Sequence, residues 1–357
     1  MYFFRKDLKI KKPVNINVPS RKVKMGLNES SLNPLKTIQE QFLVKMKNVP
    51  LNRYFNEITA ELKAKLAAYS GVSQEQLAFG NGADEMLYYL FTAVRENSNS
   101  FAVSLAPSYF DYRSYCGAVG LGIKFLSLQP DFDFSVNEFL ELSDSENCKL
   151  VILCNPNNPT GNLLDKNKIV QIIEANKNRL VMIDETYFEF SGITFADQIA
   201  HFPNLIIVRS FSKAFSIAGL RFGYMISNSN NIRELEKVMT IFHLNLMTQT
   251  FVATILDNKE IFLDHNKKVI EQKKMVFDEL NDINGIIVHP SATNFLTFSL
   301  GSRSEDLFNF MGENDIAIRP VWHHPVLKEH LRVSISGNES ENRLFLEKIK
   351  EFVSDSS

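Results

Sequence analysis

Apolar and polar residues follow two different patterns along this chain of 357 residues. Short apolar runs at 150–154, 180–184 and 204–208 are typical of strands buried on both faces of a parallel sheet. Longer segments between them, such as 164–178, repeat apolar residues every three or four positions, as one face of a helix does. From about residue 77 onward the two kinds of segment alternate. This alternation predicts a mostly parallel sheet with crossover helices.

The two ends of the chain predict helices more strongly than strands. Segments 35–47 and 57–69 are rich in helix formers, and Gly71 is placed to end the second. The carboxyl-terminal third predicts a second, smaller α+β lobe, with helices near 231–242, 250–280 and 340–353. We therefore expect an α/β fold with three parts: an arm at 1–45 that also contributes to the small domain, a large domain at 46–250 and a small domain at 251–357.

Composition limits the possible partners of the chain. Hydrophobic residues make up 45% and charged residues 22%, and the net charge is −2, which gives no reason to expect nucleic acid or an anionic membrane. No apolar run reaches the length of a membrane span, and the amino terminus lacks the apolar core of a signal peptide. The three cysteines are odd in number and lack metal-type spacing. These features predict a cytoplasmic protein.

A lysine follows the apolar run at 204–208, in a stretch at 209–221 that reads RSFSKAFSIAGLR. Open α/β sheets carry their chemistry just beyond the carboxyl ends of their strands, which is where Lys213 is expected. Its amine forms an imine with an aldehyde if its pKa is lowered. Ser210, Ser212 and Arg221 offer hydroxyls and a guanidinium that suit a phosphate. The combination suggests pyridoxal phosphate, with a solvated loop lysine as the equally frequent alternative.

Two turns add groups that suit the same site. The turn at 80–85 (GNGADE) opens a predicted helix and directs free backbone N–H groups at an anion. It matches neither the Rossmann nor the Walker pattern, so an ordinary strand–helix turn stays open. The turn at 155–161 (NPNNPTG) follows a buried strand and holds its asparagine amides between two prolines and a glycine. Three asparagines exceed what a structural turn requires.

An acid and an arginine complete the candidate chemistry. Asp184 ends a buried strand, where a carboxylate is costly unless it meets a cation or hydrogen-bond donors. A protonated pyridine nitrogen is such a cation, and Tyr187 is near enough in sequence to donate to the phenolic oxygen of the same ring. Arg332, on an alternating segment at 331–336, suits a carboxylate. A helix cap, a core tyrosine and an exposed strand arginine are the alternatives.

Taken in order, these residues resemble fold-type-I pyridoxal-phosphate aminotransferases, and more narrowly the histidinol-phosphate aminotransferase family. The resemblance runs from about residue 26 to 353. It includes LNE at 27–29, NRY at 52–54, GNGADE at 80–85, NNPTG at 157–161, DETY at 184–187, SKAFSIAGLRFG at 212–223, TN at 293–294 and LR at 331–332. So many matches at fixed spacing in one order are improbable by chance.

The resemblance implies a role for each matching residue. Lys213 would bond to the cofactor aldehyde and then move a proton between the substrate α-carbon and the cofactor C4′ atom. Asp184 would pair with the ring nitrogen, while Tyr187 and Asn158 would hold the phenolic oxygen. The other implied cofactor contacts are Tyr109 on the ring, Ser210, Ser212, Arg221 and the backbone of Ala83 and Asp84 at the phosphate, and Tyr54 from a neighbouring subunit. Arg332, Arg319 and Asn158 would bind the substrate.

The implied reaction transfers an amino group from histidinol phosphate, or a related amino acid or amine, to 2-oxoglutarate. Its partners are thus a small amino donor and a 2-oxo acid acceptor, in a homodimer with shared active sites. Two other hypotheses remain open. One is another reaction on the same scaffold, such as threonine-phosphate decarboxylation or transamination of an aromatic or specialised-pathway amino acid. The other is a catalytically silent binding relative, which the presence of Lys213, Asp184 and Tyr187 argues against.

The expected substrate pocket departs from the family pattern. Family members resemble one another in an amino-terminal tyrosine that contacts the substrate phosphate, whereas segment 11–17 reads KKPVNIN. Arg319 matches a second family arginine, but the segment VWHHP at 321–325 is unlike the usual sequence. Trp322 either shapes the pocket or belongs to the core. His323 and His324 would face opposite ways on a strand, which argues against a paired metal site, and no metal is expected.

Overall fold

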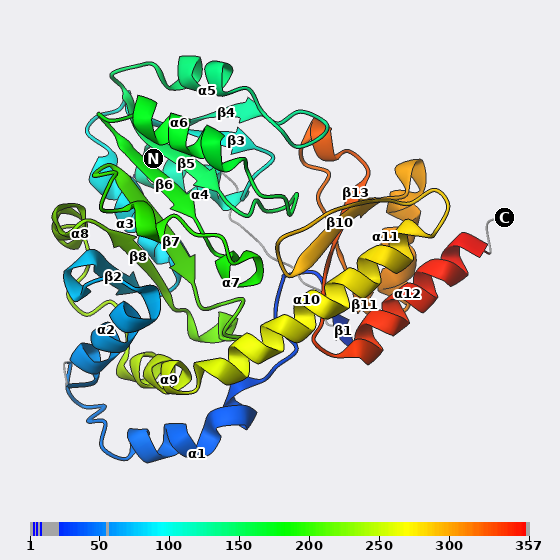
Figure 1. The fold of residues 1–357 in the computed structure, drawn as a ribbon, viewed down its shortest axis with the longest axis horizontal. Helices are drawn as coiled ribbons and strands as arrows, with labels where there is room; N and C mark the ends of the chain where they lie inside the picture. The colour runs from blue at the N-terminus through cyan, green and yellow to red at the C-terminus, as the bar shows by residue number, and fades with distance from the viewer. Residues whose placement is uncertain (1–2, 4, 6–7, 9–20, 55–56, 355–357) are drawn as a thin grey trace.

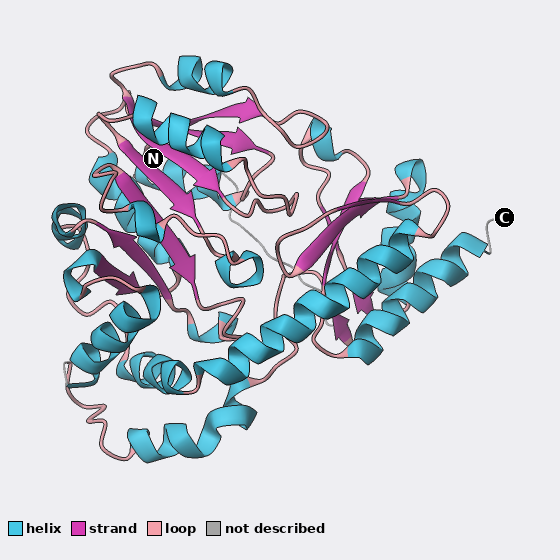
Figure 2. Ribbon diagram, in the orientation of Figure 1, coloured by secondary structure: helices cyan, strands magenta, loops and turns pink. Residues whose placement is uncertain are grey.

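The computed structural model describes residues 3, 5, 8, 21–54 and 57–354, so most of segment 1–20 in the predicted amino-terminal arm lies outside the described residues. The chain builds a large lobe around a seven-stranded sheet and a smaller lobe around a four-stranded sheet (Figures 1 and 2). The continuous part of the arm that begins at residue 21 joins the small lobe, because β1 (Val23–Lys24) pairs in parallel with β11 (Ile316–Ala317).

The large sheet has the strand order β2-β8-β7-β6-β5-β3-β4. Its strands are β2 (Leu77–Gly80), β3 (Phe101–Ala106), β4 (Gly122–Ser127), β5 (Cys148–Cys154), β6 (Leu180–Asp184), β7 (Leu205–Ser210) and β8 (Gly223–Ser227). β4, β3, β5, β6 and β7 are parallel neighbours, whereas β8 runs antiparallel to both β7 and β2. The predicted α/β fold with a mostly parallel, helix-flanked sheet is confirmed.

Both faces of this sheet are buried, which explains its continuous apolar strands. Along β5, Leu150 and Ile152 enter one core cluster, whereas Val151 and Leu153 enter the other. The first cluster is covered by α3 (Ala83–Val94), α4 (Asp111–Val119) and α8 (Ser229–Glu236), and the second by helices that include α5 (Val136–Ser143) and α6 (Lys166–Ala175). The sheet is therefore a rigid layer between two helical layers.

The small lobe has an antiparallel sheet in the order β12-β13-β10-β9. Its elements are β9 (Ile287–His289), β10 (Phe295–Ser299), β12 (Arg319–Pro320), β13 (His330–Ser334), α11 (Ser304–Glu313) and α12 (Glu339–Ser354). The long helix α10 (Lys259–Asn281) packs on α7 (Phe188–Ser191) beside the large sheet and on α12 of the small lobe (Figure 1). At the base of the large lobe, α1 (Pro34–Met46) and α2 (Glu57–Ser70) pack on α9 (Leu246–Asp257).

Several helix ends differ from the sequence expectation. The segment 250–280 was expected as one helix, but α9 and α10 are separate because Asn258 leaves helical geometry, with φ −119° and ψ 24°. The helix expected at 164–178 begins at Lys166, because the Asp165 carboxylate caps it by accepting from the backbone N–H groups of Asn167 and Lys168. The helix expected at 231–242 ends early, at Glu236.

Membrane-spanning helices and metal-binding clusters are both absent from the described part of the chain. Within residues 21–54 and 57–354, none of the helices is both long and apolar enough to cross a membrane. The same residues bring together no group of three or more His, Cys, Asp or Glu side chains able to hold a metal ion.

A close approach of three segments depends on two glycines. A Cβ atom on Gly223, at the start of β8, would lie 2.2 Å from the backbone nitrogen of Ala83, the first residue of α3. Gly82 has φ +91°, a conformation that favours glycine, and an added Cβ there would meet the guanidinium of Arg221. The beginning of α3 therefore lies against the loop 211–222 and the start of β8, closer than side chains would allow.

We expect Gly223→Ala to lower the free energy of unfolding by about 1–3 kcal/mol, because the added methyl group meets backbone that cannot yield easily. Denaturant unfolding of the purified protein measures this change. Gly219→Ala is the matched control, since a Cβ at Gly219 meets nothing within 4 Å. Equal unfolding midpoints for the two variants would contradict the account.

Candidate active site

Three neighbouring parallel strands end at one edge of the large sheet. β5 ends at Cys154, β6 at Asp184 and β7 at Ser210, and the loops 155–161, 185–187 and 211–222 begin there. Because parallel strands share a direction, these loops meet at the same edge, where open α/β sheets bind their ligands. The motifs that are distant in sequence are thereby brought together.

Asp184 is a buried carboxylate with two hydrogen-bond donors. The hydroxyl of Tyr112 donates to its Oδ2 atom at 2.6 Å, and the backbone N–H of Thr186 donates to Oδ1 at 3.0 Å. Burial raises the pKa of Asp184, and the Tyr112 and Thr186 hydrogen bonds oppose that rise. Among the described residues Asp184 forms no ion pair. A protonated ring nitrogen would supply the missing cation, so this position fits the pyridine of pyridoxal phosphate.

Lys213 lies just beyond β7, with its amine directed toward the amino-terminal segment. Its Nζ atom donates to the backbone oxygen of Leu27 at 2.9 Å. Burial lowers the pKa of Lys213 to about 8, and the positive charge of Arg332 acts in the same direction. A substantial fraction of the amine is therefore neutral near neutral pH, and only the neutral amine is a nucleophile toward an aldehyde.

Phosphate-binding groups surround the beginning of α3. Arg221 donates to the Ser212 hydroxyl at 3.4 Å and forms an ion pair of 2.7 Å with Asp84. The Ser210 hydroxyl accepts from the backbone N–H of Ser212 at 3.1 Å. Ala83 begins α3, whose first backbone N–H groups have no partner within the helix. Hydroxyls, a guanidinium and a helix N-terminus together fit the phosphate of the cofactor.

Tyr187 is buried opposite the amino-terminal segment. Its hydroxyl accepts from Asn28 Nδ2 at 2.8 Å, which leaves the phenolic hydrogen free to donate elsewhere. Burial raises the pKa of Tyr187, so the hydroxyl stays protonated. Asn28 is itself held by Ser334, which receives a hydrogen bond from the Asn28 backbone N–H at 2.8 Å and donates to its side-chain oxygen at 3.1 Å. Tyr187 can therefore act as a fixed donor to a ring oxygen.

Arg332 and Arg319 stand directly opposite each other in the register of β13 and β12. Arg332 donates to Asn158 Oδ1 at 2.7 Å and to the Gly26 oxygen at 2.9 Å, but its buried Nε atom has no partner in the described part of the chain. Burial lowers the pKa of Arg332 to about 10. Like charges across a strand pair repel, so an anion between them would relieve the repulsion. The pair fits a carboxylate or a phosphate.

The remaining expected residues lie nearer the surface. Tyr109 is partly buried between α3 and α4, where its hydroxyl donates to Asp84 at 3.1 Å and its ring meets Tyr112 edge-on at 5.3 Å. Tyr54 is 74% exposed and stacks on Phe242 with ring centroids 4.1 Å apart. The structure therefore brings Tyr109 into the group around Asp84, whereas Tyr54 lies apart from it within this chain.

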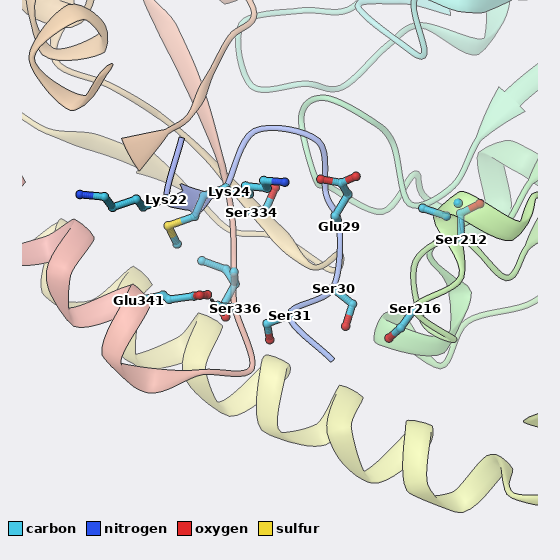
Figure 3. A pocket seen from close by; sticks show the side chains of 14 residues that line it. Lys22, Lys24, Glu29, Ser30, Ser31, Ser212, Ser216, Ser334, Ser336 and Glu341 are labelled. Carbon is cyan, nitrogen blue, oxygen red and sulfur yellow. Dashed lines mark hydrogen bonds between the residues drawn. The ribbon is translucent and has the colours of Figure 1, made fainter. Parts of the chain in front are cut away.

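A polar pocket of about 380 Å³ borders the site (Figure 3). Ser212 lines it from the large lobe, Ser334 from the small lobe, and Glu29 projects between them from the amino-terminal segment (Figure 3). Its lining does not include Lys213 or Asp184, so this pocket lies beside the group of ionisable residues and does not contain it.

Three contributions to the site were not identified from the sequence. Tyr112 follows Tyr109 by three residues, and this spacing on a helix was the signal that could have predicted its contact with Asp184. Asn28 and the backbone of Leu27 had no such signal, because their partners Tyr187 and Lys213 lie 159 and 186 residues away.

The structure of the segment after β12 shows how Trp322 packs. Trp322 packs against the core, with its ring 6.1 Å from that of Phe308 at a steep angle. His323 and His324 lie in a turn and not on a strand. Trp322 is therefore a core residue, and the two histidines need not face opposite ways.

The comparisons with known proteins agree with this geometry. The chain matches the family model described as aminotransferase class I and II over residues 20–349. It is 32% identical over 328 residues to the histidinol-phosphate aminotransferase of Caldanaerobacter subterraneus subsp. tengcongensis, covering 92% of each chain. It is 33% identical over 336 residues to that of Clostridium novyi, covering 94% of this chain and 93% of the other.

A solved structure supports the fold. The crystal structure of histidinol-phosphate aminotransferase from Sinorhizobium meliloti, in complex with pyridoxal-5'-phosphate, superposes with a TM-score of 0.87. The match covers 99% of this chain and 98% of that chain at 22% identity.

The lowered pKa of Lys213 predicts how covalent loading with pyridoxal phosphate depends on pH. In protein freed of cofactor, the loading rate should rise with pH and level off above about pH 8, because only the neutral amine attacks the aldehyde. Absorbance of protein-bound cofactor over a series of pH values measures this rate. Lys213→Ala should give no such absorbance. A rate that keeps rising to the ordinary lysine pKa of 10.5 would argue against the lowered value.

Proposed function

This chain belongs to the aminotransferase class I and II family and is a pyridoxal-phosphate-dependent aminotransferase, and we propose that its amino donor is histidinol phosphate or a related amino compound, with 2-oxoglutarate as acceptor. The observation that carries the substrate proposal is the facing pair Arg319 and Arg332. A phosphate ester and a dicarboxylate both supply an anion that two adjacent guanidiniums can bind. The names of the relatives support the same donor.

We propose that Lys213 and Asp184 carry the chemistry. When bound, pyridoxal phosphate supplies an electron-accepting ring that stabilises the charge left on the donor carbon after loss of its proton. Lys213 Nζ, which is neutral more often than an ordinary lysine amine, takes that proton and returns it to a neighbouring carbon. Asp184 provides the negative charge that holds the ring nitrogen protonated, and the Tyr112 hydroxyl fixes the orientation of its carboxylate.

The other residues position the reactants in this proposal. Tyr187 donates to the ring oxygen, assisted by Asn158, and Tyr109 packs on the ring. Ser210, Ser212, Arg221 and the first N–H groups of α3, those of Ala83 and Asp84, hold the phosphate. Arg332 and Arg319 hold the substrate anion, with Asn158 orienting Arg332 at 2.7 Å. In this assignment the cofactor-binding residues lie in 46–250, and the two substrate-binding arginines lie in 251–357.

We also infer that the enzyme is a homodimer with shared active sites. Tyr54 is 74% exposed and stacks on Phe242, which is 53% exposed, and the neighbouring Ile241 is 72% exposed. Exposed apolar side chains gathered in one patch are typical of interaction surfaces. A second copy covering this patch would bring Tyr54 to the cofactor phosphate of its partner.

Asp184→Asn tests the role of the acid. The amide keeps the volume of the carboxylate and can still accept from Tyr112, but it carries no charge to hold the ring nitrogen protonated. We expect cofactor absorbance to remain and kcat to fall by about 100-fold or more. Cofactor spectra and steady-state kinetics on the same preparation measure both quantities. Wild-type turnover in this variant would remove Asp184 from the mechanism.

The donor proposal predicts a strong preference for a phosphorylated amine. In the first half-reaction, the absorbance of the bound cofactor should disappear at least about 100-fold more efficiently with histidinol phosphate than with histidinol. Histidinol lacks the phosphate, so it would leave the buried charged donors of the site unpaired, which is costly. Stopped-flow absorbance with both amines measures the ratio, and phenylalanine is the control donor. Equal efficiency for the two amines would exclude phosphate recognition. Release of carbon dioxide from threonine phosphate would instead identify a decarboxylase.

A further inference from the structure

The turn after β12 sends three consecutive side chains in three directions. Trp322 packs into the core beside Phe308. His324 caps the short helix η6 (Pro325–Leu327), its Nδ1 atom accepting from the Val326 N–H at 3.3 Å. His323, between them, is exposed and makes no hydrogen bond to any other residue in the described ranges. Two of the three side chains thus have structural roles, and the third does not.

The His323 ring faces the large lobe across the mouth of the site. It meets the ring of Phe110 edge-on, with centroids 5.4 Å apart and an interplanar angle of 78°. Phe110 directly follows Tyr109, the residue proposed to pack on the cofactor ring. The contact therefore joins the small lobe to the start of α4 next to the proposed cofactor position. It holds the imidazole beside the residue that follows Tyr109.

The charged groups around His323 are mostly cationic. Shielding from water lowers its pKa, and so do the nearby His324, Arg319 and Arg332, which places the ring within the field of both arginines. Arg319 is exposed and forms no ion pair with another described residue. Asp111 follows Phe110 at the start of α4, and its carboxyl group lies within the field of Arg319. Burial raises the pKa of Asp111, and Arg319 opposes that rise.

Three side chains in this region have hydrogen-bond donors without acceptors among the described residues. Arg332 keeps a buried Nε–H without a partner in the described part of the chain, Arg319 stands opposite it, and His323 has an uncommitted ring N–H. A carboxylate brings one negative charge to the two guanidiniums, whereas a phosphate monoester brings up to two. The charge of the two arginines thus favours a phosphate.

We propose that His323 is a specificity-determining residue that donates a hydrogen bond to a phosphate monoester carried by the amino donor, alongside Arg319. This inference rests on the proposed function, since it assumes that the donor reaches the site between Arg319 and Arg332. It adds a residue to the substrate contacts, and it predicts that the donor carries a phosphate ester. Phe110 sets the position of the imidazole and closes one side of the subsite.

Two substitutions at His323 and one at its neighbour test this role in the cofactor-loaded enzyme. His323→Phe keeps a ring against Phe110 but removes both nitrogens, and His323→Asn restores one donor near the position of Nδ1. His324→Asn is the matched control, because its side-chain oxygen can still cap η6. His323 is exposed, so these changes should leave the thermal unfolding midpoint near that of wild type.

The measured quantity is kcat/KM for histidinol phosphate divided by kcat/KM for histidinol. His323→Phe should lower this ratio by about tenfold or more through KM, with kcat little changed, because the bond is made equally in the ground and transition states. His323→Asn should recover part of the ratio, and His324→Asn should match wild type. Inorganic phosphate, tested as an inhibitor, should bind His323→Phe correspondingly more weakly than wild type.

The donor comparison and the phosphate-inhibition measurement together separate this inference from the donor proposal. If wild type does not prefer histidinol phosphate but phosphate inhibits it and His323→Phe weakens that inhibition, the donor proposal fails and the role of His323 stands. A wild-type ratio and wild-type phosphate inhibition in His323→Phe would overturn the role of His323. A wild-type enzyme that shows neither preference nor inhibition would overturn both.

Discussion

Burial acts on Lys213 and Asp184 through the same physical effect, the loss of water around an ionisable group. It lowers the pKa of the amine to about 8 and raises the pKa of the carboxyl group. The proposed role of Lys213 uses its neutral form, which desolvation and the positive charge of Arg332 both favour. The proposed role of Asp184 uses its charged form, which Tyr112 and Thr186 favour by donating hydrogen bonds. A water-excluded sheet edge thus suits both the neutral amine and the charged carboxylate only because hydrogen bonds favour the carboxylate anion.

A buried ion pair holds the two strands that present these groups. Glu185 follows Asp184 at the end of β6, and Arg209 precedes Ser210 near the end of β7. Their side chains meet in two hydrogen bonds of 2.8 and 2.9 Å, both fully inside the protein. Such pairs add little net stability but are costly to break, because one charge would remain buried alone. This pair and the backbone pairing of β6 with β7 together hold Asp184 near Ser210, the proposed phosphate ligand.

The sequence was sufficient for those parts of the fold and site that depend on local patterns. The runs ending at Cys154, Asp184 and Val208 predicted central strands, because strands buried on both faces carry uninterrupted apolar residues. Contacts between distant segments were beyond such reasoning. Nothing local to Asn28 indicates that it forms a hydrogen bond with Tyr187. The short strand β8, which runs antiparallel beside β7, was not predicted from its sequence. The predicted helix ends were wrong where a single side chain, such as the Asp165 cap, determines the first turn.

The segment 25–28 is held by residues that come much later in the chain. Met25 O accepts from the Ser334 N–H, Gly26 O from Arg332, and Leu27 O from Lys213. A ribosome releases residues 25–28 long before residues 332–334, so the contacts with the small lobe cannot form until that lobe has been translated. The large sheet can fold earlier as a unit. Completion of the site therefore waits for the synthesis of β13, and a product truncated before that strand would carry Lys213 without Arg332.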